Sequence, residues 1–290
     1  MQIDKARVLP IVRAALKEDI GKGDITTQSI VGRLASARAV IVTRESCAVC
    51  GVGIAEMVMA QIDRNVRFEP NCIDGAFIGP GKEVAFLEGS TASILRAERT
   101  MLNFITFLSG VSTRTYQYIE KVKPSEVKIM DTRKTIPLLR YLEKYAVSMG
   151  GGTNHRMGLY DQVLIKDNHI HCRKLAFGQG RKFSLKGMIE EARKKNPENI
   201  KVEIEVSNLE EFSDALSGKP DVIMLDNMNV EDIKACVEAR KLCDIKPLLE
   251  VSGGITLDTI SKFAHIGIDM ISVGELTDSV RAIDMSLDLL

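Results

Sequence analysis

The sequence predicts an α/β protein, with a small α+β unit in its first part and a parallel sheet built from βαβ units in its second part. Three observations support this prediction. Between residues 35 and 88, short apolar segments with strand character are separated by glycine-containing turns. From residue 127 onward, short apolar segments alternate with helical stretches, which is typical of a parallel sheet. A length of 290 residues and a hydrophobic fraction of 45% supply enough core for one large domain or two smaller ones.

The first part is expected to begin with a helix and to continue with strands around a second helix. Apolar residues recur with helical spacing over residues 4–19, where Pro10 either starts or kinks the helix. The expected strands cover 39–42, 66–69 and 83–87, and the helix between them covers 54–62. Ser90 is a good N-cap for the next helix, which is expected to run to Gly110 and to resume toward Val122.

The second part is expected to hold six strands joined by helices and loops. The strands cover residues 127–131, 162–166, 202–206, 222–226, 248–252 and 270–273. A helix is expected after Thr135, with Pro137 in its first turn, and another over 257–263. The polar stretch 172–186 is predicted to be a long exposed loop.

Polar residues or glycines stand at or near the ends of these apolar strands. They are Asp131, Lys166, Glu205, Asp226, Ser252 and Gly274. In a parallel barrel and in an open parallel sheet alike, the active site gathers where the strands finish, so we expect these residues to converge.

Two carboxylates share one face of the strand over 202–206. Glu203 and Glu205 are two residues apart and therefore point to the same side. A buried carboxylate is costly unless it is paired with a cation or binds a metal or substrate, and both explanations are open here. Because Asp226 ends the next strand, carboxylates from the two strands could hold Mg²⁺.

Cationic residues stand just beyond strands or beyond the three glycines over 150–152. Arg133, Lys134, His155, Arg156 and Lys166 are cationic or can become so. The planar fork of arginine matches carboxylates and phosphates, and lysine acts as a mobile point charge. A solvated surface is the ordinary explanation for any single one of them, but their place after strands or after three glycines favours an anion site.

Two short glycine segments also follow strands. Ser252-Gly253-Gly254 precedes an expected helix, and Ser272-Val273-Gly274 repeats the arrangement one unit later. Glycines at such points let a phosphate approach the backbone, although many βα loops need glycine for the turn alone.

Composition excludes several other functions. The net charge is zero, which removes a bulk electrostatic case for nucleic-acid binding. No apolar run approaches the about 20 residues that span a bilayer, and the N-terminus does not resemble a signal peptide. Six cysteines without an export signal favour a cytoplasmic protein with reduced thiols, and Cys47 and Cys50 are expected to be structural. There is no P-loop or Rossmann fingerprint.

Several long strings carry a resemblance to one family. They are Asp131 to Thr135, Gly150 to Arg156, Leu164 to His169, Leu225 to Asn227 and, nearer the N-terminus, Glu18 to Gly21, Gly23 to Thr27, Ala97 to Arg99 and Leu102-Asn103. These strings, spread over nearly the whole chain, resemble quinolinate phosphoribosyltransferases. The resemblance implies a decarboxylating transfer from 5-phosphoribosyl-1-pyrophosphate to quinolinate with Mg²⁺, giving nicotinate mononucleotide, pyrophosphate and CO₂ in NAD biosynthesis.

The same resemblance implies an architecture and an assembly. An N-terminal α/β sandwich domain over residues 1–110 would precede an incomplete, TIM-like α/β barrel over residues 111–276. The tail over residues 277–290 would pack back on the first domain. A homodimer or a higher homo-oligomer is expected, in which the N-terminal domain of one copy completes the site of the other.

The resemblance also implies roles for individual residues. Quinolinate would be bound by Arg99 of a partner copy and by Thr132, Arg133, Lys134, His155 and Arg156. Lys166 would face either substrate. Glu205 and Asp226 would hold the ribose hydroxyls and Mg²⁺, and Lys134, Glu205 and Asp226 would be catalytic. The 5-phosphate would lie against Ser252, Gly253, Gly254, Val273 and Gly274.

Three other functions are weighed against this one. A nicotinate phosphoribosyltransferase or the molybdenum-transport-associated relative would share the scaffold, but three arginines with His155 suit two carboxylates better than one. A Schiff-base aldolase would use Lys134 or Lys166 as its nucleophile. A sensor of phosphoribosyl ligands or a purely structural dimer would bind without releasing pyrophosphate.

Overall fold

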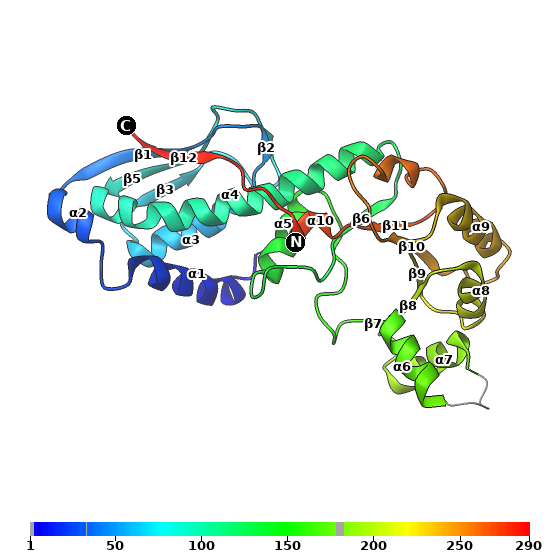
Figure 1. Cartoon of the computed structure of the whole chain (residues 1–290). Coiled ribbons are helices and arrows are strands. Elements are labelled where there is room, and N and C mark those ends of the chain that lie inside the picture. The colour runs from blue at the N-terminus through cyan, green and yellow to red at the C-terminus, as the bar shows by residue number, and fades with distance from the viewer. Residues whose placement is uncertain (1–2, 33, 178–182) are drawn as a thin grey trace. The chain divides into compact units, whose positions relative to one another are not determined.

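The computed structural model describes residues 3–32, 34–177 and 183–290 and divides the chain into two compact units (Figure 1). The first unit consists of residues 1–116, 135–152 and 276–290, and the second of residues 117–134 and 153–275. The division therefore differs from a single boundary after residue 110, because the segment 135–152 belongs to the first unit.

The first unit is built on a four-stranded antiparallel sheet in the order β12-β1-β5-β3. Its strands are β1 (Ser36–Thr43), β3 (Arg67–Pro70), β5 (Glu83–Ser90) and β12 (Met285–Leu289), and β2 (Cys47–Ala48) pairs separately with β4 (Phe77–Ile78). The C-terminal tail supplies β12, whose pairing with β1 runs from Ala39 opposite Leu289 to Thr43 opposite Met285. The sheet with its helices agrees with the expected fold class, and the pairing of β12 places residues 285–289 in this sheet.

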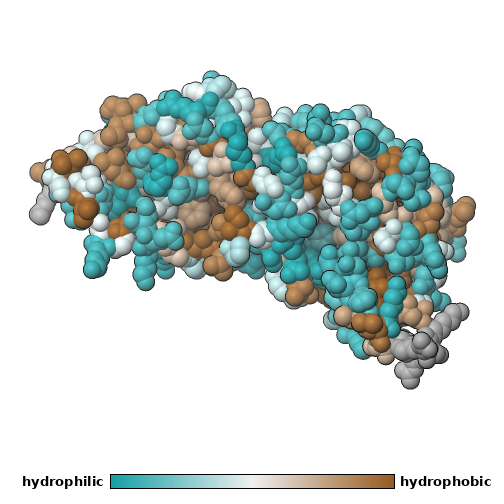
Figure 2. All heavy atoms as spheres, viewed as in Figure 1, coloured by the Kyte–Doolittle hydropathy of each residue, from teal (hydrophilic) through white to brown (hydrophobic). Residues whose placement is uncertain are grey.

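Helices of the first unit are α1 (Lys5–Ile20), α2 (Ile25–Ile30), α3 (Val52–Ile62), α5 (Arg140–Met149) and α4 (Thr91–Val122) as far as Tyr116. Pro10 lies inside α1, beyond its first turn. At α2, Ile25 and Ile30 are each 78% exposed, and Figure 2 shows apolar side chains reaching the surface there. An exposed apolar group of this kind is typical of a contact surface.

Helix α4 is continuous through Gly110, so the expected interruption there is wrong. A Cβ atom at Gly110 would lie 2.4 Å from the backbone oxygen of Arg281. The glycine therefore serves the close approach of the C-terminal tail, and its low helix propensity is outweighed by the long apolar face of the helix.

The second unit is a six-stranded parallel sheet in the order β6-β11-β10-β9-β8-β7. The strands are β6 (Lys128–Met130), β7 (Val163–Ile165), β8 (Val202–Val206), β9 (Val222–Asp226), β10 (Leu248–Ser252) and β11 (Met270–Ser272). All six expected strands are confirmed, and β8, β9 and β10 have the expected bounds. Because β6 and β7 are the two edges, the described part of this unit forms an incomplete barrel.

Helices follow the strands of this sheet. They are α6 (Asp167–Phe177), α7 (Leu185–Lys195), α8 (Leu209–Ser217), α9 (Val230–Lys241) and α10 (Glu275–Asp278), the last of which is shared with the first unit. Apolar side chains of β8 and β9 on the face away from Glu203, such as Ile204 and Leu225, are buried. Among the helices within the described ranges, none is long and apolar enough to cross a membrane.

Three expected elements are corrected. The loop over 172–186 is wrong where α6 and α7 occupy it, and residues 178–182 lie outside the described residues. Helix α6 was concealed by its polar surface, since Ile170 is its main buried side chain. The helix over 257–263 is only a 3₁₀ turn over Ile260–Lys262. Helix α5 begins at Arg140 and not after Thr135, because Leu138 has a φ of 70° that breaks the helix.

Asp74 joins three segments of the first unit. Its Oδ1 accepts hydrogen bonds from the backbone N–H of Gly51, 2.9 Å away, and of Val52, 3.0 Å away, at the start of α3. Tyr145 of α5 donates its hydroxyl to Oδ2 at 2.7 Å. Burial, followed by the hydrogen bond and the charge of Asp74, raises the pKa of Tyr145, so the hydroxyl keeps its proton for donation.

We predict that Asp74→Ala lowers the free energy of unfolding by about 2–3 kcal/mol, because the substitution leaves two N–H groups and a hydroxyl without their acceptor. Tyr145→Phe removes only one of the three bonds and should lower it by about 1 kcal/mol. Denaturant unfolding measures both values. Equal stability of Asp74→Ala and the unsubstituted protein would contradict this role.

Candidate active site

The expected site residues, apart from Arg99, all belong to the second unit. Parallel pairing brings the strand ends together: Asp226 lies opposite Ser252, and Ser272 lies opposite Met130. Arg99 is exposed on α4, in the part of that helix that belongs to the first unit.

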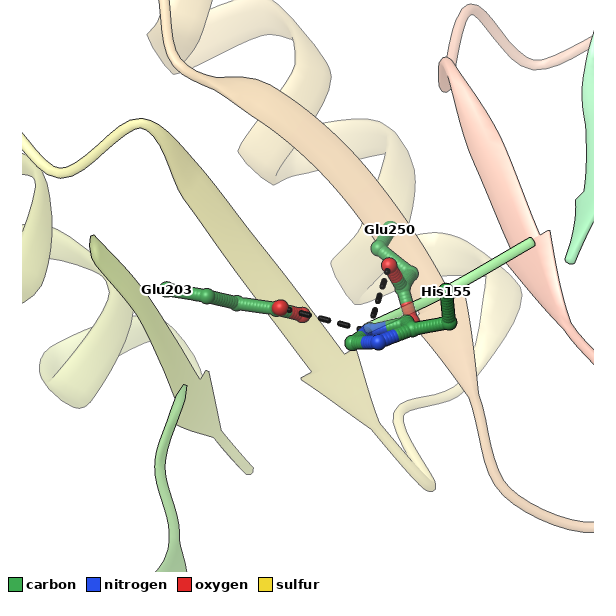
Figure 3. Close-up of side chains that lie close together, drawn as sticks. All are labelled: His155, Glu203 and Glu250. Carbon is green, nitrogen blue, oxygen red and sulfur yellow. Dashed lines mark ion pairs between the residues drawn. The ribbon is translucent and has the colours of Figure 1, made fainter. Parts of the chain in front are cut away.

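A histidine lies between two buried carboxylates inside the sheet (Figure 3). His155 Nε2 is 3.2 Å from Glu203 Oε2 on β8 and 3.6 Å from Glu250 Oε2 on β10. The glutamate side chains are 0% and 1% exposed. Figure 3 shows both carboxylates turned toward the imidazole ring. Two acids can be accommodated at this depth because each is close to a hydrogen-bonding partner.

The other ring nitrogen of His155 is also engaged. The backbone N–H of Arg156 donates to His155 Nδ1 at 2.7 Å, so Nδ1 is an acceptor and the ring proton lies on Nε2, facing the carboxylates. His155, Glu203 and Glu250 place possible ligand atoms within 4.8 Å of one another, but a metal on Nε2 would displace that proton. The three residues therefore form a hydrogen-bonded cluster better suited to holding His155 than to holding a metal.

Glu250 is the more strongly perturbed acid of the cluster. Burial, and then the charge of Glu203, raise the pKa of Glu250 to about 8. Ser272 on β11 donates its hydroxyl to Glu250 Oε1 at 2.5 Å. The raised pKa favours the protonated form of Glu250, which reduces the negative charge buried in the cluster.

The cluster continues outward to Arg156, which is 7% exposed. Gln162 donates its side-chain amide to Glu203 Oε2 at 2.6 Å, and the backbone oxygen of Gln162 accepts from Arg156 Nη1 at 3.0 Å. Burial, and then repulsion from Arg133, lower the pKa of Arg156. Two guanidinium groups close enough to repel one another make a site that an anion would stabilise.

Asp131 anchors the segment that carries these groups. It is fully buried at the end of β6, where Oδ1 accepts from the backbone N–H of His155 at 2.8 Å and Oδ2 accepts from the side chain of Asn154 at 2.7 Å. Nearby, the hydroxyl of Thr132 accepts from the backbone N–H of Lys134 at 3.0 Å. The basic segments after β6 and before β7 are therefore held against the same strand end.

A second group gathers at the ends of β7, β8 and β9. Lys166 Nζ is 3.1 Å from Glu205 Oε2, and the backbone N–H of Lys166 donates to Nδ1 of His169. Glu205 and Asp226 line one cavity of about 370 Å³ together with Asp167 and Glu211. Burial raises the pKa of Glu205, Lys166 opposes this shift, and Asp226 and Asp167 add to it. Oxygen ligands that repel one another in an open cavity fit a hydrated divalent cation.

The glycine segments lie at the neighbouring strand ends. Gly253 and Gly254 have φ values of 100° and 60°, a region that most side chains avoid. A Cβ atom at Gly254 would meet nothing within 4 Å, so this side of the turn is open to a ligand. Val273 is buried and donates its backbone N–H to Met130, which fixes the second segment, ending at Gly274, beside β6.

Sequence reasoning missed Glu250, Asn227 and Gln162 as parts of this site. Glu250 could have been found, because it alternates with Ser252 in an apolar strand and so shares the face of that strand end. In the sequence, Asn227 stands only at the end of a family string, and Gln162 stands only at the start of an expected strand. Neither residue has a local signal that distinguishes it from a loop amide.

Comparison with known proteins agrees with this geometry. The models of the quinolinate phosphoribosyl transferase N-terminal and C-terminal domains match residues 24–109 and 111–288. The nicotinate-nucleotide pyrophosphorylase (carboxylating) of Mycobacterium leprae is 38% identical, over 99% of this chain and 98% of its own length. A Methanocaldococcus jannaschii protein named as a probable enzyme of the same kind is 40% identical, over 98% of each chain.

A solved structure extends the comparison to three dimensions. The nicotinate-nucleotide pyrophosphorylase of Francisella tularensis superposes with a TM-score of 0.91 at 39% identity. The alignment covers 100% of this chain and 98% of that one. The similarity therefore includes both units of the chain.

We predict that Glu250→Gln removes part of the pH dependence of stability. The raised pKa makes the native protein hold a proton that the unfolded chain loses above its ordinary pKa of 4.5. The stabilising contribution of protonated Glu250 is therefore complete below pH 4.5 and declines as pH rises to about 8. Between pH 5 and pH 8, the free energy of unfolding of Glu250→Gln should therefore rise by on the order of 3 kcal/mol relative to that of the unsubstituted protein.

Unfolding curves at several pH values measure this gain. Ser272→Ala is the control, because it removes the hydroxyl donor but leaves the titrating group, so its pH dependence should remain. Parallel pH profiles for Glu250→Gln and the unsubstituted protein would show that Glu250 does not take up the proton.

Proposed function

The chain belongs to the quinolinate phosphoribosyltransferase family, and we propose that the strand-end site of its second unit carries out the reaction of that family. The enzyme transfers the phosphoribosyl group of 5-phosphoribosyl-1-pyrophosphate to quinolinate and releases CO₂ and pyrophosphate, giving nicotinate mononucleotide for NAD biosynthesis. The observation that carries the assignment of residues is Arg156, a buried guanidinium held by the backbone oxygen of Gln162 at the strand-end site, whose pKa the charge of Arg133 helps to lower.

Quinolinate carries two carboxylates on adjacent ring carbons, and the basic segments supply charges for both. Arg133 and Arg156 repel one another in the free site, so a dianion between them relieves the repulsion and gains bidentate hydrogen bonds. Lys134 and Thr132 come from the same strand end as Arg133. Because both nitrogens of His155 are engaged, we assign it to holding the Arg156 segment in place, and a direct contact with substrate would require breaking one of those bonds.

The phosphoribosyl group is assigned to the neighbouring strand ends. Glu205 and Asp226 would face the ribose and, with waters, Mg²⁺, which would neutralise the pyrophosphate leaving group. Their charges would also stabilise the oxocarbenium-like centre that forms as the glycosidic bond breaks. The turn at Gly253 and Gly254 offers an open backbone to the 5-phosphate, with the Val273–Gly274 segment beside it.

The alternatives fit less well. A Schiff-base lysine is usually desolvated, whereas Lys166 is 46% exposed and in an ion pair with Glu205. A nicotinate phosphoribosyltransferase would need to satisfy one carboxylate, which leaves one member of the arginine pair without an anion. A sensor without turnover would not require carboxylates beside the sugar.

Assembly and location are also part of the proposal. Arg99 is exposed on α4, and the exposed apolar side chains of α2 would be covered in a homo-oligomer. We propose that Arg99 reaches the site of a second copy, where it would add a third guanidinium for quinolinate. All six cysteines are free thiols, which suits the reducing cytoplasm.

The proposed function is tested by mixing the protein with quinolinate, phosphoribosyl pyrophosphate and Mg²⁺ and measuring pyrophosphate and CO₂. Stoichiometric release of both, with nicotinate mononucleotide as product, is expected. Turnover of nicotinate in place of quinolinate would overturn the choice of substrate.

We predict that Arg156→Ala raises KM for quinolinate by about 10- to 100-fold, since it removes a charged hydrogen-bonding partner of a substrate carboxylate. KM for phosphoribosyl pyrophosphate should change much less. Steady-state kinetics measure both constants. Arg64→Ala, an exposed arginine of the first unit, is the matched control and should behave as the unsubstituted protein. An unchanged KM for quinolinate would remove Arg156 from the binding site.

We predict that Glu205→Gln lowers kcat by about 100-fold and changes the two KM values little, because its charge acts mainly on the transition state. Single-turnover kinetics with both substrates saturating measure the chemical step. A variant with normal kcat would show that the carboxylate charge is not needed there.

A further inference from the structure

Asn227 connects two strand ends of the proposed phosphoribosyl site. It follows Asp226 with a φ of 53°, in the left-handed region that asparagine tolerates better than most residues. Its side-chain Nδ2 donates to Asp226 Oδ2 at 2.8 Å. Its backbone N–H donates to the backbone oxygen of Ser252 at 2.9 Å. One residue therefore contacts the carboxylate that ends β9 and the backbone that ends β10.

The side chain of Asn227 also occupies the space beside Gly253. A Cβ atom built on Gly253 would lie 2.3 Å from Asn227 Oδ1 and 2.8 Å from Nδ2, which is closer than real Cβ contacts allow. Gly253 has a φ of 100°, so its backbone shape already depends on the lack of a side chain. The amide and the glycine thus fit each other across the gap between the two strand ends.

We infer that Asn227 is a positioning residue that fixes the Asp226 carboxylate and the Gly253 turn relative to one another. The inference deepens the proposed function and rests on it, because it gives the two contacts a common purpose in binding phosphoribosyl pyrophosphate. Asp226 would face the ribose or hydrated Mg²⁺, and the glycine turn would face the 5-phosphate. Asn227 sets the distance between these two contacts.

This position requires a left-handed backbone, a hydrogen-bond donor to Asp226 and a side chain that fills the space beside Gly253. Asparagine meets all three requirements. Aspartate would bring a second charge against Asp226 and would lose the Nδ2 donor. Glycine would keep the left-handed backbone but would lose both the donor and the contact with Gly253. Alanine would lose the side chain and add backbone strain. The hydrogen bond from the Asn227 side chain engages Oδ2 of Asp226. It leaves Oδ1 of Asp226 for a ribose hydroxyl or a metal-bound water.

The test compares variants that separate the side chain from the backbone. N227G keeps the left-handed conformation and removes the amide, so the melting temperature should be close to that of the unsubstituted protein. KM for phosphoribosyl pyrophosphate should rise by about tenfold or more, while KM for quinolinate stays within about twofold. N227D keeps the shape but removes the donor, and its KM for phosphoribosyl pyrophosphate should rise at least as much.

A double-substitution cycle tests the contact with Gly253. G253A alone should raise KM for phosphoribosyl pyrophosphate, because the new methyl group meets the Asn227 amide. In the N227G background the same methyl group has lost that neighbour, so its effect should be smaller. Equal effects in both backgrounds would show that the contact has no part in binding.

Calorimetric binding of phosphoribosyl pyrophosphate with Mg²⁺ separates the inference from the proposed function. If the unsubstituted protein binds this ligand but does not turn over quinolinate, the proposed function fails, and tenfold weaker binding by N227G still supports the positioning role. Binding and kinetic constants of N227G within twofold of the unsubstituted values would overturn the inference. Equal losses for both substrates, or an unsubstituted protein that does not bind phosphoribosyl pyrophosphate, would overturn it as well.

Discussion

The burial of acidic groups inside a parallel sheet is the constraint on which the second unit depends. Glu203 and Glu250 have almost no exposed surface, and water cannot stabilise their charges there. Glu203 is stabilised by the Nε2–H of His155 and by the side-chain amide of Gln162. Glu250 is stabilised by its raised pKa, which favours the protonated form, and by the hydroxyl of Ser272. His155 and Gln162 come from the loop before β7 and Ser272 comes from β11, so holding the acids also fixes these two segments against β8 and β10.

The substrate site is an outward extension of this buried cluster. His155 accepts a hydrogen bond from the backbone N–H of Arg156, and the backbone oxygen of Gln162 accepts one from the Arg156 guanidinium. Both His155 and Gln162 are in turn held by Glu203, so the guanidinium expected to bind an anion is supported indirectly by this carboxylate. Such indirect support keeps cations in place despite their mutual repulsion. The neighbouring carboxylates at Glu205 and Asp226 are more open, which suits contact with a sugar and a hydrated ion.

Strands and single functional side chains are easier to predict from this sequence than the contacts between them. The strands over 202–206, 222–226 and 248–252 were predictable because buried parallel strands are continuous apolar runs. Arg133 and Arg156 stood out because cations beside glycines at strand ends are unusual. Helix α6 was missed because its polar surface hides a helical period, and the pairing of Glu250 with His155 was missed because strand order cannot be read from one strand. The role of Asn227 depends on a left-handed φ, which local sequence does not fix.

The return of β12 to β1 affects how the chain can fold during synthesis. The partner of residues 39–43 lies at residues 285–289, so that edge of the first sheet stays uncovered while the residues between these two segments are synthesised. The six strands of the second unit all precede residue 273 and can pair earlier. The nascent N-terminal portion must therefore remain free of aggregation until residues 285–289 have been made, and a product that lacks them would expose β1 as an open edge.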